Sequence, residues 1–154
     1  MGFDIYAIEP RKSLSHPEAD YSYFRSNVWF WRPLWSYIIY SCPELTDEEV
    51  EAGNDNSGNK IVDTTAVMIG NRLMENINSR KVDSYKLERD KYLDSLDDVI
   101  CFGCNGIGRR DDNECSSCQG SGLTKSMETY YRFDVELVKE FSYFCLNSGG
   151  FEIW

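Results

Sequence analysis

The chain has 154 residues, of which 42% are hydrophobic and 14% aromatic, and a formal net charge of −10. This length suits one domain with room for a small insert, and the aromatic rings can bury enough area to form its core. A surface this acidic repels nucleic-acid phosphates and anionic membranes, so basic protein surfaces are the favoured partners. The acidity also has a simpler explanation, because net charge keeps a protein soluble.

The sequence predicts neither a membrane span nor an export signal. It contains no apolar run of about 18 residues, the length that a transmembrane helix needs. Its first six residues carry an acid, Asp4, and no basic flank, which is not typical of a signal peptide. Tyr6 occupies the position where a myristoylation motif has Ser or Thr. We therefore expect a cytoplasmic protein, in which reduced cysteine pairs hold metal more often than they form disulfides.

The first predicted element is a short N-terminal strand. Its apolar residues alternate with polar ones, as in a half-buried strand: Phe3, Ile5 and Ala7. Pro10 ends this strand, and the polar residues 11–23 are expected to form a loop.

A Trp-rich segment follows at residues 23–35 and holds three of the four tryptophans. Pro33 suits the first turn of a helix that would run to Tyr40, with Tyr37 and Ile38 on one side. The rings of this segment could form a ligand-stacking platform or part of the core. We favour the core, because so many rings leave a short chain few other ways to bury them.

Two helices are predicted in the middle of the chain. Thr46 and Glu49 have the spacing of a capping box, which marks the start of a short helix. Asp63 or Thr64 caps a longer helix that would run to about Arg80. The apolar residues of that longer helix recur at spacings of three and four, which places them on one face: Ala66, Ile69, Leu73 and Ile77.

Two more helices flank the cysteine-rich region. Asp83 or Ser84 caps the helix before it, and Asp134 caps the helix after it. The later helix has an apolar side that includes Val138, Phe141 or Ser142, and Cys145. Gly149 and Gly150 end that helix. The alternating residues 151–154 then predict a last strand, which we expect to pair with the first.

The strongest chemical signal is the pattern Cys-x-x-Cys-x-Gly-x-Gly, which occupies residues 101–108 and again residues 115–122. Two such pairs at close range can supply four thiolates to one tetrahedral zinc ion. The expected ligands are Cys101, Cys104, Cys115 and Cys118. Four cysteines saturate the ion, so we expect one structural Zn²⁺ rather than a catalytic one. A redox dithiol and an iron–sulfur site are the alternatives.

The residues between and after the cysteines fit a zinc knuckle. Glycine after the second cysteine of each pair permits positive φ and lets backbone amides approach the sulfurs. These knuckle glycines are Gly106, Gly108, Gly120 and Gly122. The stretch between the repeats has the length of a hairpin, and its tip is a possible contact surface formed by Arg109, Arg110, Asp111 and Asp112.

The repeated pattern resembles the cysteine-rich zinc finger of DnaJ-type co-chaperones. In that family four repeats bind two zinc ions and help to handle unfolded polypeptide, so two repeats imply one zinc ion. The resemblance covers residues 101–122 only. The J-domain signature His-Pro-Asp has only the partial counterpart His16-Pro17-Glu18, which follows no basic helix and which we interpret as a turn. The resemblance therefore implies no chaperone partnership.

Three other segments look like a group of small uncharacterised phage and bacterial proteins: residues 1–6, 23–35 and 148–154. In that group the zinc segment is an optional middle insert, and no activity carries over. The resemblance implies a phage origin, the host cytoplasm as location, and a finger placed on an existing scaffold. We accordingly expect an α+β fold: a mostly helical single domain, residues 1–98 with 123–154, with a small terminal β-sheet and a zinc-knuckle insert at 99–122.

No catalytic constellation stands out in the sequence. His16 is the only histidine and lies in a predicted loop, while Cys42 and Cys145 are single cysteines. Carboxylates are frequent, but no pair differs from the acidic background, and there is no phosphate-binding loop. We therefore expect no enzyme and no catalytic residues. The favoured interpretation is a non-enzymatic zinc-binding protein that acts through protein–protein interaction.

Three alternatives stay open at this stage. A nucleic-acid-binding finger would need a local basic patch with aromatic rings for stacking. Its candidate residues are Arg109, Arg110, Lys125 and Arg132, with Tyr130, Tyr131 and Phe133. An acidic chain could also mimic nucleic acid and inhibit a host enzyme. Finally, an enzyme could use the Trp-rich face as the floor of a pocket.

Overall fold

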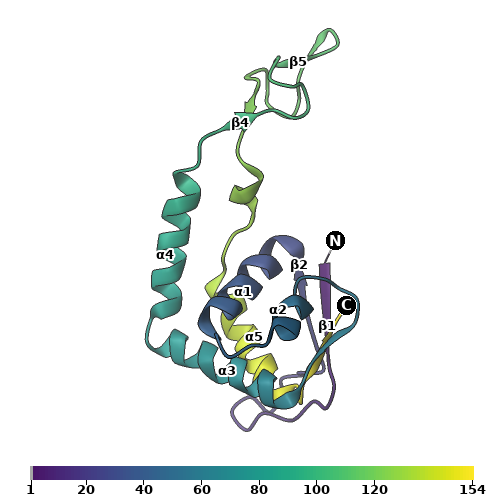
Figure 1. Ribbon diagram of the computed structural model, residues 1–154, viewed down its shortest axis with the longest axis vertical. Helices are drawn as coiled ribbons and strands as arrows, with labels where there is room; N and C mark the ends of the chain where they lie inside the picture. Colours follow the sequence, from purple (N-terminus) through teal and green to yellow (C-terminus); the bar gives the residue numbers. More distant parts are fainter. Residues whose placement is uncertain (1) are drawn as a thin grey trace. The chain divides into compact units, whose positions relative to one another are not determined.

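The computed structural model describes residues 2–154, and the chain divides into two compact units (Figure 1). The first unit holds the residues up to Leu87 together with Arg132–Trp154, and the second is Glu88–Tyr131. Within the described residues, five α-helices account for 44% of the chain and strands for 16%, which confirms the predicted α+β class. The segment predicted as an insert, residues 99–122, lies inside the second unit.

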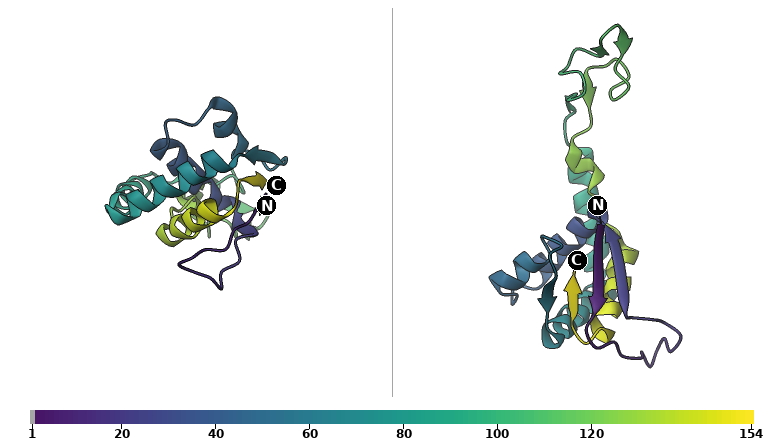
Figure 2. Two further views of the ribbon diagram at one scale, coloured as in Figure 1. Left: turned by 90° about the horizontal axis from the view of Figure 1, so that it is seen from below. Right: turned by 90° about the vertical axis from the view of Figure 1, so that its right-hand side faces the viewer.

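An antiparallel sheet in the order β2-β1-β8-β3 forms one layer of the first unit. Its strands are β1 (Gly2–Ala7), β2 (Tyr23–Asn27), β3 (Asn59–Ile61) and β8 (Phe151–Ile153). The predicted pairing of the first and last strands is confirmed, since Ile5 lies opposite Ile153. The strands β1 and β8 therefore lie side by side (Figure 2). Strands β2 and β3, at the two edges of the sheet, were not predicted.

Helices cover one face of this sheet (Figure 2). They are α1 (Val28–Ser41), α2 (Asp47–Ala52), α3 (Asp63–Asn78) and α5 (Val135–Asn147). A further helix, α4 (Lys81–Asp94), begins in the first unit and ends in the second. Alternation along the strands decides which side chains meet the helices: Ile5 and Phe151 are fully buried, whereas Tyr6 points to the exposed face.

Helix α1 begins earlier than the sequence predicted. Asn27 caps it, because its side chain accepts hydrogen bonds from the backbone N–H groups of Trp29 and Phe30. Pro33 therefore lies inside the helix and not in its first turn, so that prediction was wrong. Proline has no N–H, and α1 loses one internal hydrogen bond at this position.

The tryptophans of α1 divide between core and surface. Trp31 and Trp35 are buried and stack with their ring centroids 5.6 Å apart. Their indole N–H groups donate to the backbone carbonyls of Gly53 and Val50, so neither ring leaves a polar atom unpaired. Trp29, in contrast, is 36% exposed. The core interpretation is thus confirmed for two of the three rings.

Two of the predicted helix caps are present as expected. Thr46 and Glu49 form a complete capping box at the start of α2. Asp134 caps α5, because its carboxylate accepts from the N–H groups of Glu136 and Leu137. The start of α3 differs from the prediction: its N-cap is Val62, which makes no side-chain hydrogen bond.

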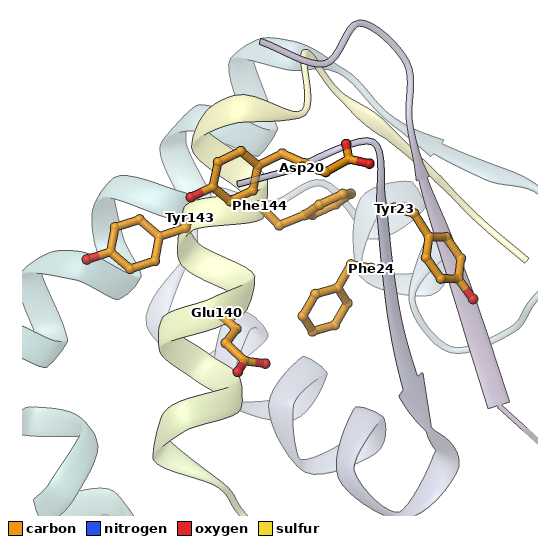
Figure 3. Close-up of a pocket in the computed structure, with 7 residues that line it drawn as sticks. Asp20, Tyr23, Phe24, Glu140, Tyr143 and Phe144 are labelled. Carbon is orange, nitrogen blue, oxygen red and sulfur yellow. The ribbon is translucent and has the colours of Figure 1, made fainter. Parts of the chain in front are cut away.

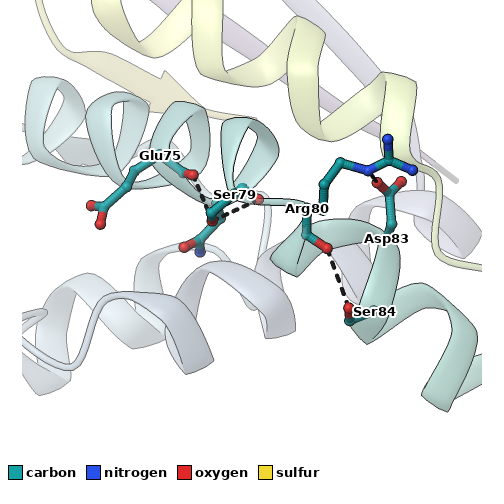
Figure 4. A network of polar contacts seen from close by, with 6 residues as sticks. Glu75, Ser79, Arg80, Asp83 and Ser84 are labelled. Atoms are coloured by element: carbon teal, nitrogen blue, oxygen red, sulfur yellow. Dashed lines mark hydrogen bonds and ion pairs between the residues drawn. The ribbon is translucent and has the colours of Figure 1, made fainter.

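The junction between α3 and α4 also differs from the prediction. Arg80, where φ is +62°, separates the two helices, and α4 begins at Lys81 instead of after Asp83 or Ser84. Two polar contacts join Arg80 to the first turn of α4 (Figure 4): Arg80 forms an ion pair with Asp83, and the Ser84 hydroxyl donates to the Arg80 carbonyl. Arg80 is thus a non-glycine residue in the left-handed region, where such residues are uncommon.

Candidate metal centre

Two short ladders frame the cysteine motif in the second unit. Strand β4 (Val99–Ile100) pairs with β7 (Leu123–Thr124), which joins the two ends of the motif. Strand β5 (Arg109–Arg110) pairs with β6 (Asn113–Glu114), which closes the hairpin between the two repeats. Each repeat thus has a paired strand at both of its ends, and the cysteines lie between the two ladders.

The structure brings the four cysteines together in one buried cluster. Their Sγ atoms all lie within 4.8 Å of one another, at 3.9 Å for Cys101 and Cys115 and 3.7 Å for Cys104 and Cys118. Four thiolates around one ion with metal–sulfur bonds of about 2.3 Å would lie about 3.8 Å apart. The geometry therefore suits a single ion with four sulfur ligands. In the part of the chain that the structure describes, no second group of three or more such ligands occurs.

The two repeats make equivalent hydrogen bonds. The N–H of Gly108 donates to Cys104 Sγ at 3.2 Å, and the N–H of Gly122 donates to Cys118 Sγ at 3.3 Å. The backbone also crosses between repeats, since the N–H of Cys101 donates to the Gly122 carbonyl and the N–H of Cys115 to the Gly108 carbonyl. Amide donors that point at sulfur stabilise the thiolate form, which is the form that binds metal.

Close approach of the repeats explains the last glycine of each pattern. A Cβ on Gly108 would lie 2.2 Å from the carbonyl oxygen of Gly120, and a Cβ on Gly122 would lie 2.3 Å from that of Gly106. Both glycines also have positive φ, +79° and +75°. Neither position can hold a larger residue without moving the backbone of the opposite repeat.

Two of the thiols differ in their ease of ionisation. Burial raises the pKa of the Cys101 thiol to about 11. The pKa of Cys115 falls to about 7, first because the backbone N–H of Ser117 donates to its sulfur. A lowered pKa favours the thiolate of Cys115, which is the form that binds metal.

The contact tip predicted between the repeats is an exposed hairpin. Arg109 and Arg110 form β5, and Asp111 turns the chain with φ of +55°. Two apolar side chains of the first repeat are also exposed, Phe102 at 95% and Ile107 at 76%. The sequence reasoning missed both. Both occupy x positions of the Cys-x-x-Cys-x-Gly-x-Gly pattern. Because cysteines fill the interior of the knuckle, apolar residues at x positions could have been predicted to be exposed.

One of the rings proposed for nucleic-acid stacking is buried. Phe133 is buried in the core of the first unit, where it packs against Tyr37 and Tyr85. Lys125 forms an ion pair with Asp98 in the second unit. The prediction that Phe133 is available for stacking was therefore wrong, because its ring completes an aromatic cluster.

The other chemically active residues lie in the first unit. The ring of His16 contacts Tyr143 edge-on at 4.8 Å, and its Nδ1 lies 2.9 Å from the Ser15 hydroxyl. Cys42 and Cys145 are buried in the core as free thiols. Burial raises the pKa of Cys42 to about 11 and raises that of Cys145 well above its ordinary value. Cys145 therefore lies on the buried side of its helix, which confirms the apolar side predicted for that helix.

Comparisons with protein-family models, curated proteins and solved structures found no match for this chain. Within the described residues, no helix combines the length and the apolar character that crossing a bilayer requires.

Proposed function

We propose that Cys101, Cys104, Cys115 and Cys118 bind one structural Zn²⁺ ion. The observation that carries this proposal is the buried cluster of four sulfurs, all within 4.8 Å of one another. Four thiolates in a tetrahedral arrangement are typical of structural zinc sites. An iron–sulfur cluster would need more space, because its cysteines bind different iron atoms. The likeness of the repeats to the DnaJ-type finger also favours zinc.

The zinc ion in this proposal stabilises the second unit and has no catalytic role. Four sulfurs fill the coordination shell and leave no position for water or substrate. The four cysteines are the buried cluster of this unit, so the ion replaces the hydrophobic core that so short a segment cannot build. The protein as a whole is accordingly proposed to be non-enzymatic.

The second unit is proposed to act by protein–protein interaction. Phe102 and Ile107 are exposed apolar side chains held on a cross-linked knuckle, and rigid apolar anchors are typical of protein contacts. The hairpin tip adds charges of both signs through Arg109, Arg110 and the two aspartates after them. The likeness to small phage and bacterial proteins adds a phage-encoded origin and a host-cytoplasm setting to this proposal.

Metal content tests the zinc site directly. The wild-type chain, purified under reducing conditions without added metal, is expected to carry one zinc per chain by mass spectrometry of the metal. Cys118→Ser is expected to lose it, because three thiolates and a hydroxyl bind zinc far more weakly. Cys42→Ala removes a cysteine outside the cluster and should keep full zinc. A wild-type chain without zinc, or a Cys118→Ser chain with full zinc, would contradict the proposal.

A surface variant tests the proposed contact. The double change Phe102→Ser and Ile107→Ser leaves every ligand in place and should retain zinc. Partners that co-purify with the tagged wild-type chain from a bacterial lysate should be lost with this variant. A partner that still co-purifies with the double variant, but is lost after nuclease treatment, would favour the nucleic-acid alternative.

A further inference from the structure

A cavity of about 230 Å³ opens in the first unit between strand β2 and helix α5 (Figure 3). The rings of Phe24 and Phe144, with centroids 5.7 Å apart, pack together at this cavity. Tyr21 and Tyr143 add aromatic surface, and Asp20 and Glu140 add two carboxylates. The described residues that line the cavity include no lysine or arginine. Aromatic faces combined with carboxylates form a site for a cation.

The cavity lies beside a free sheet edge. Among the described residues, β2 pairs only with β1, so its other side carries no strand. The N–H of Ala7 donates to the carbonyl of Ser22, the residue just before β2, and this bond fixes the alternation of hydrogen bonds between β1 and β2. Because antiparallel bonding alternates, the backbone N–H and C=O groups of Tyr23 and Arg25 point away from β1. These groups are available to a further strand.

Side chains along β2 alternate in the sense that an added strand would need. The side chain of Tyr23 lies on the outer face, where its hydroxyl donates to Asp4, whereas Phe24 lies on the α5 side (Figure 3). A strand added at this edge would likewise direct every second side chain towards α5. One of those side chains would then enter the cavity. The groove between an edge strand and a helix is a recurrent site for extended peptides.

We propose that this groove binds an extended polypeptide segment as a fifth strand, with one lysine or arginine side chain in the cavity between Asp20 and Glu140. Charge favours this occupant, because both charged groups of the cavity are acidic and the whole chain has a net charge of −10. The N–H of Ser22 donates to the Asp20 carboxylate and lowers its pKa, so that carboxylate stays ionised at neutral pH. The site lies in the first unit and requires no metal ion.

Chemical-shift mapping on the full ¹⁵N-labelled, zinc-loaded chain tests this proposal. The probe is a short peptide of alternating valine and threonine with one central lysine. Matched peptides carry norleucine or glutamate at the centre. We expect the lysine peptide to shift the amides of Tyr23, Arg25 and Glu140, to bind at least about threefold more tightly than the norleucine peptide, and to weaken with added salt. Glu140→Gln should remove most of that difference.

Backbone pairing is tested separately from charge. Arg25→Pro deletes the outward N–H and should abolish binding, whereas Arg25→Ala removes the same side chain, keeps the N–H and should bind. If Arg25→Pro fails to fold, a lysine peptide methylated on its edge-facing amides replaces it and should not bind the wild-type chain.

Three results would overturn the proposal. The first is the absence of shifts in β2 with every peptide. The second is equal affinity for the lysine and norleucine peptides. The third is a dimer in sedimentation with concentration-dependent shifts in β2, which would assign this edge to a second copy of the chain.

Discussion

Replacing Gly122 by alanine tests how the two repeats pack around the proposed zinc ion. The new Cβ would lie 2.3 Å from the carbonyl oxygen of Gly106, and φ at this position is +75°. An alanine in the left-handed region costs about 1–2 kcal/mol. Relief of the overlap requires the opposite backbone to move and adds about 1–3 kcal/mol. Since metal binding and folding of the knuckle are coupled, both costs appear as lost zinc affinity.

Gly120 is the matched control for this substitution. Its φ of +80° imposes the same left-handed cost, but the atoms nearest to a Cβ there belong to the flexible side chain of Glu114, at 3.2 Å. The first repeat offers an equivalent pair, with Gly108 against a carbonyl and Gly106 against the Ile100 side chain. The difference within each pair therefore isolates contact between the repeats from backbone strain.

Competition with a chromophoric zinc chelator measures these effects. Gly120→Ala is expected to weaken zinc binding by about 5- to 30-fold, which corresponds to 1–2 kcal/mol. Gly122→Ala should bind a further 5- to 150-fold more weakly, from the roughly 1–3 kcal/mol of the overlap. Equal affinities for the two variants would refute the packing of the repeats. Wild-type affinity in both would refute the left-handed geometry as well.

Three further predictions concern metal removal, thiol reactivity and pH. A chelator should collapse the amide dispersion of residues 101–122 but leave tryptophan fluorescence unchanged, because all four tryptophans belong to the first unit; a large fluorescence change would contradict this. Cys42 should react with iodoacetamide at pH 8 only after denaturation, because it is buried and its pKa of about 11 lowers its thiolate fraction about 100-fold. Mass spectrometry should therefore find the same number of iodoacetamide adducts on the folded wild type and on folded Cys42→Ala. Burial alone would raise the pKa of Glu49, but hydrogen bonds from Thr65 and from the backbone and side chain of Thr46 outweigh it, and the net pKa is lowered. The ionised carboxylate therefore stabilises the fold at pH values above its ordinary pKa, and this contribution disappears as the pH falls. Glu49→Gln should therefore lower the free energy of unfolding at pH 7 by about 1 kcal/mol, seen as a lower melting temperature, and should have no effect below about pH 3. The same loss of stability at pH 7 and at pH 3 would contradict this role of the carboxylate.

Local patterns in the sequence predicted two helix caps whose contacts are themselves local. The capping box of Thr46 and Glu49 and the cap at Asp134 involve residues no more than three apart, and both are present. The four cysteines could be selected as one site because their spacing alone brings each pair together. The start of α1 was misplaced, because Pro33 was given a role that the Asn27 cap fills six residues earlier.

The sequence by itself determined the four sulfur atoms and the α+β class, and it predicted that the first and last strands pair; the structure added that they run antiparallel. Only the tertiary structure showed that Tyr23–Asn27 is an edge strand and that a cavity with two carboxylates lies between it and α5. The edge position of β2 and the cavity depend on packing against other segments, and no pattern within residues 23–27 encodes that packing. The same holds for Gly108 and Gly122, whose requirement for glycine comes from the carbonyl of the opposite repeat.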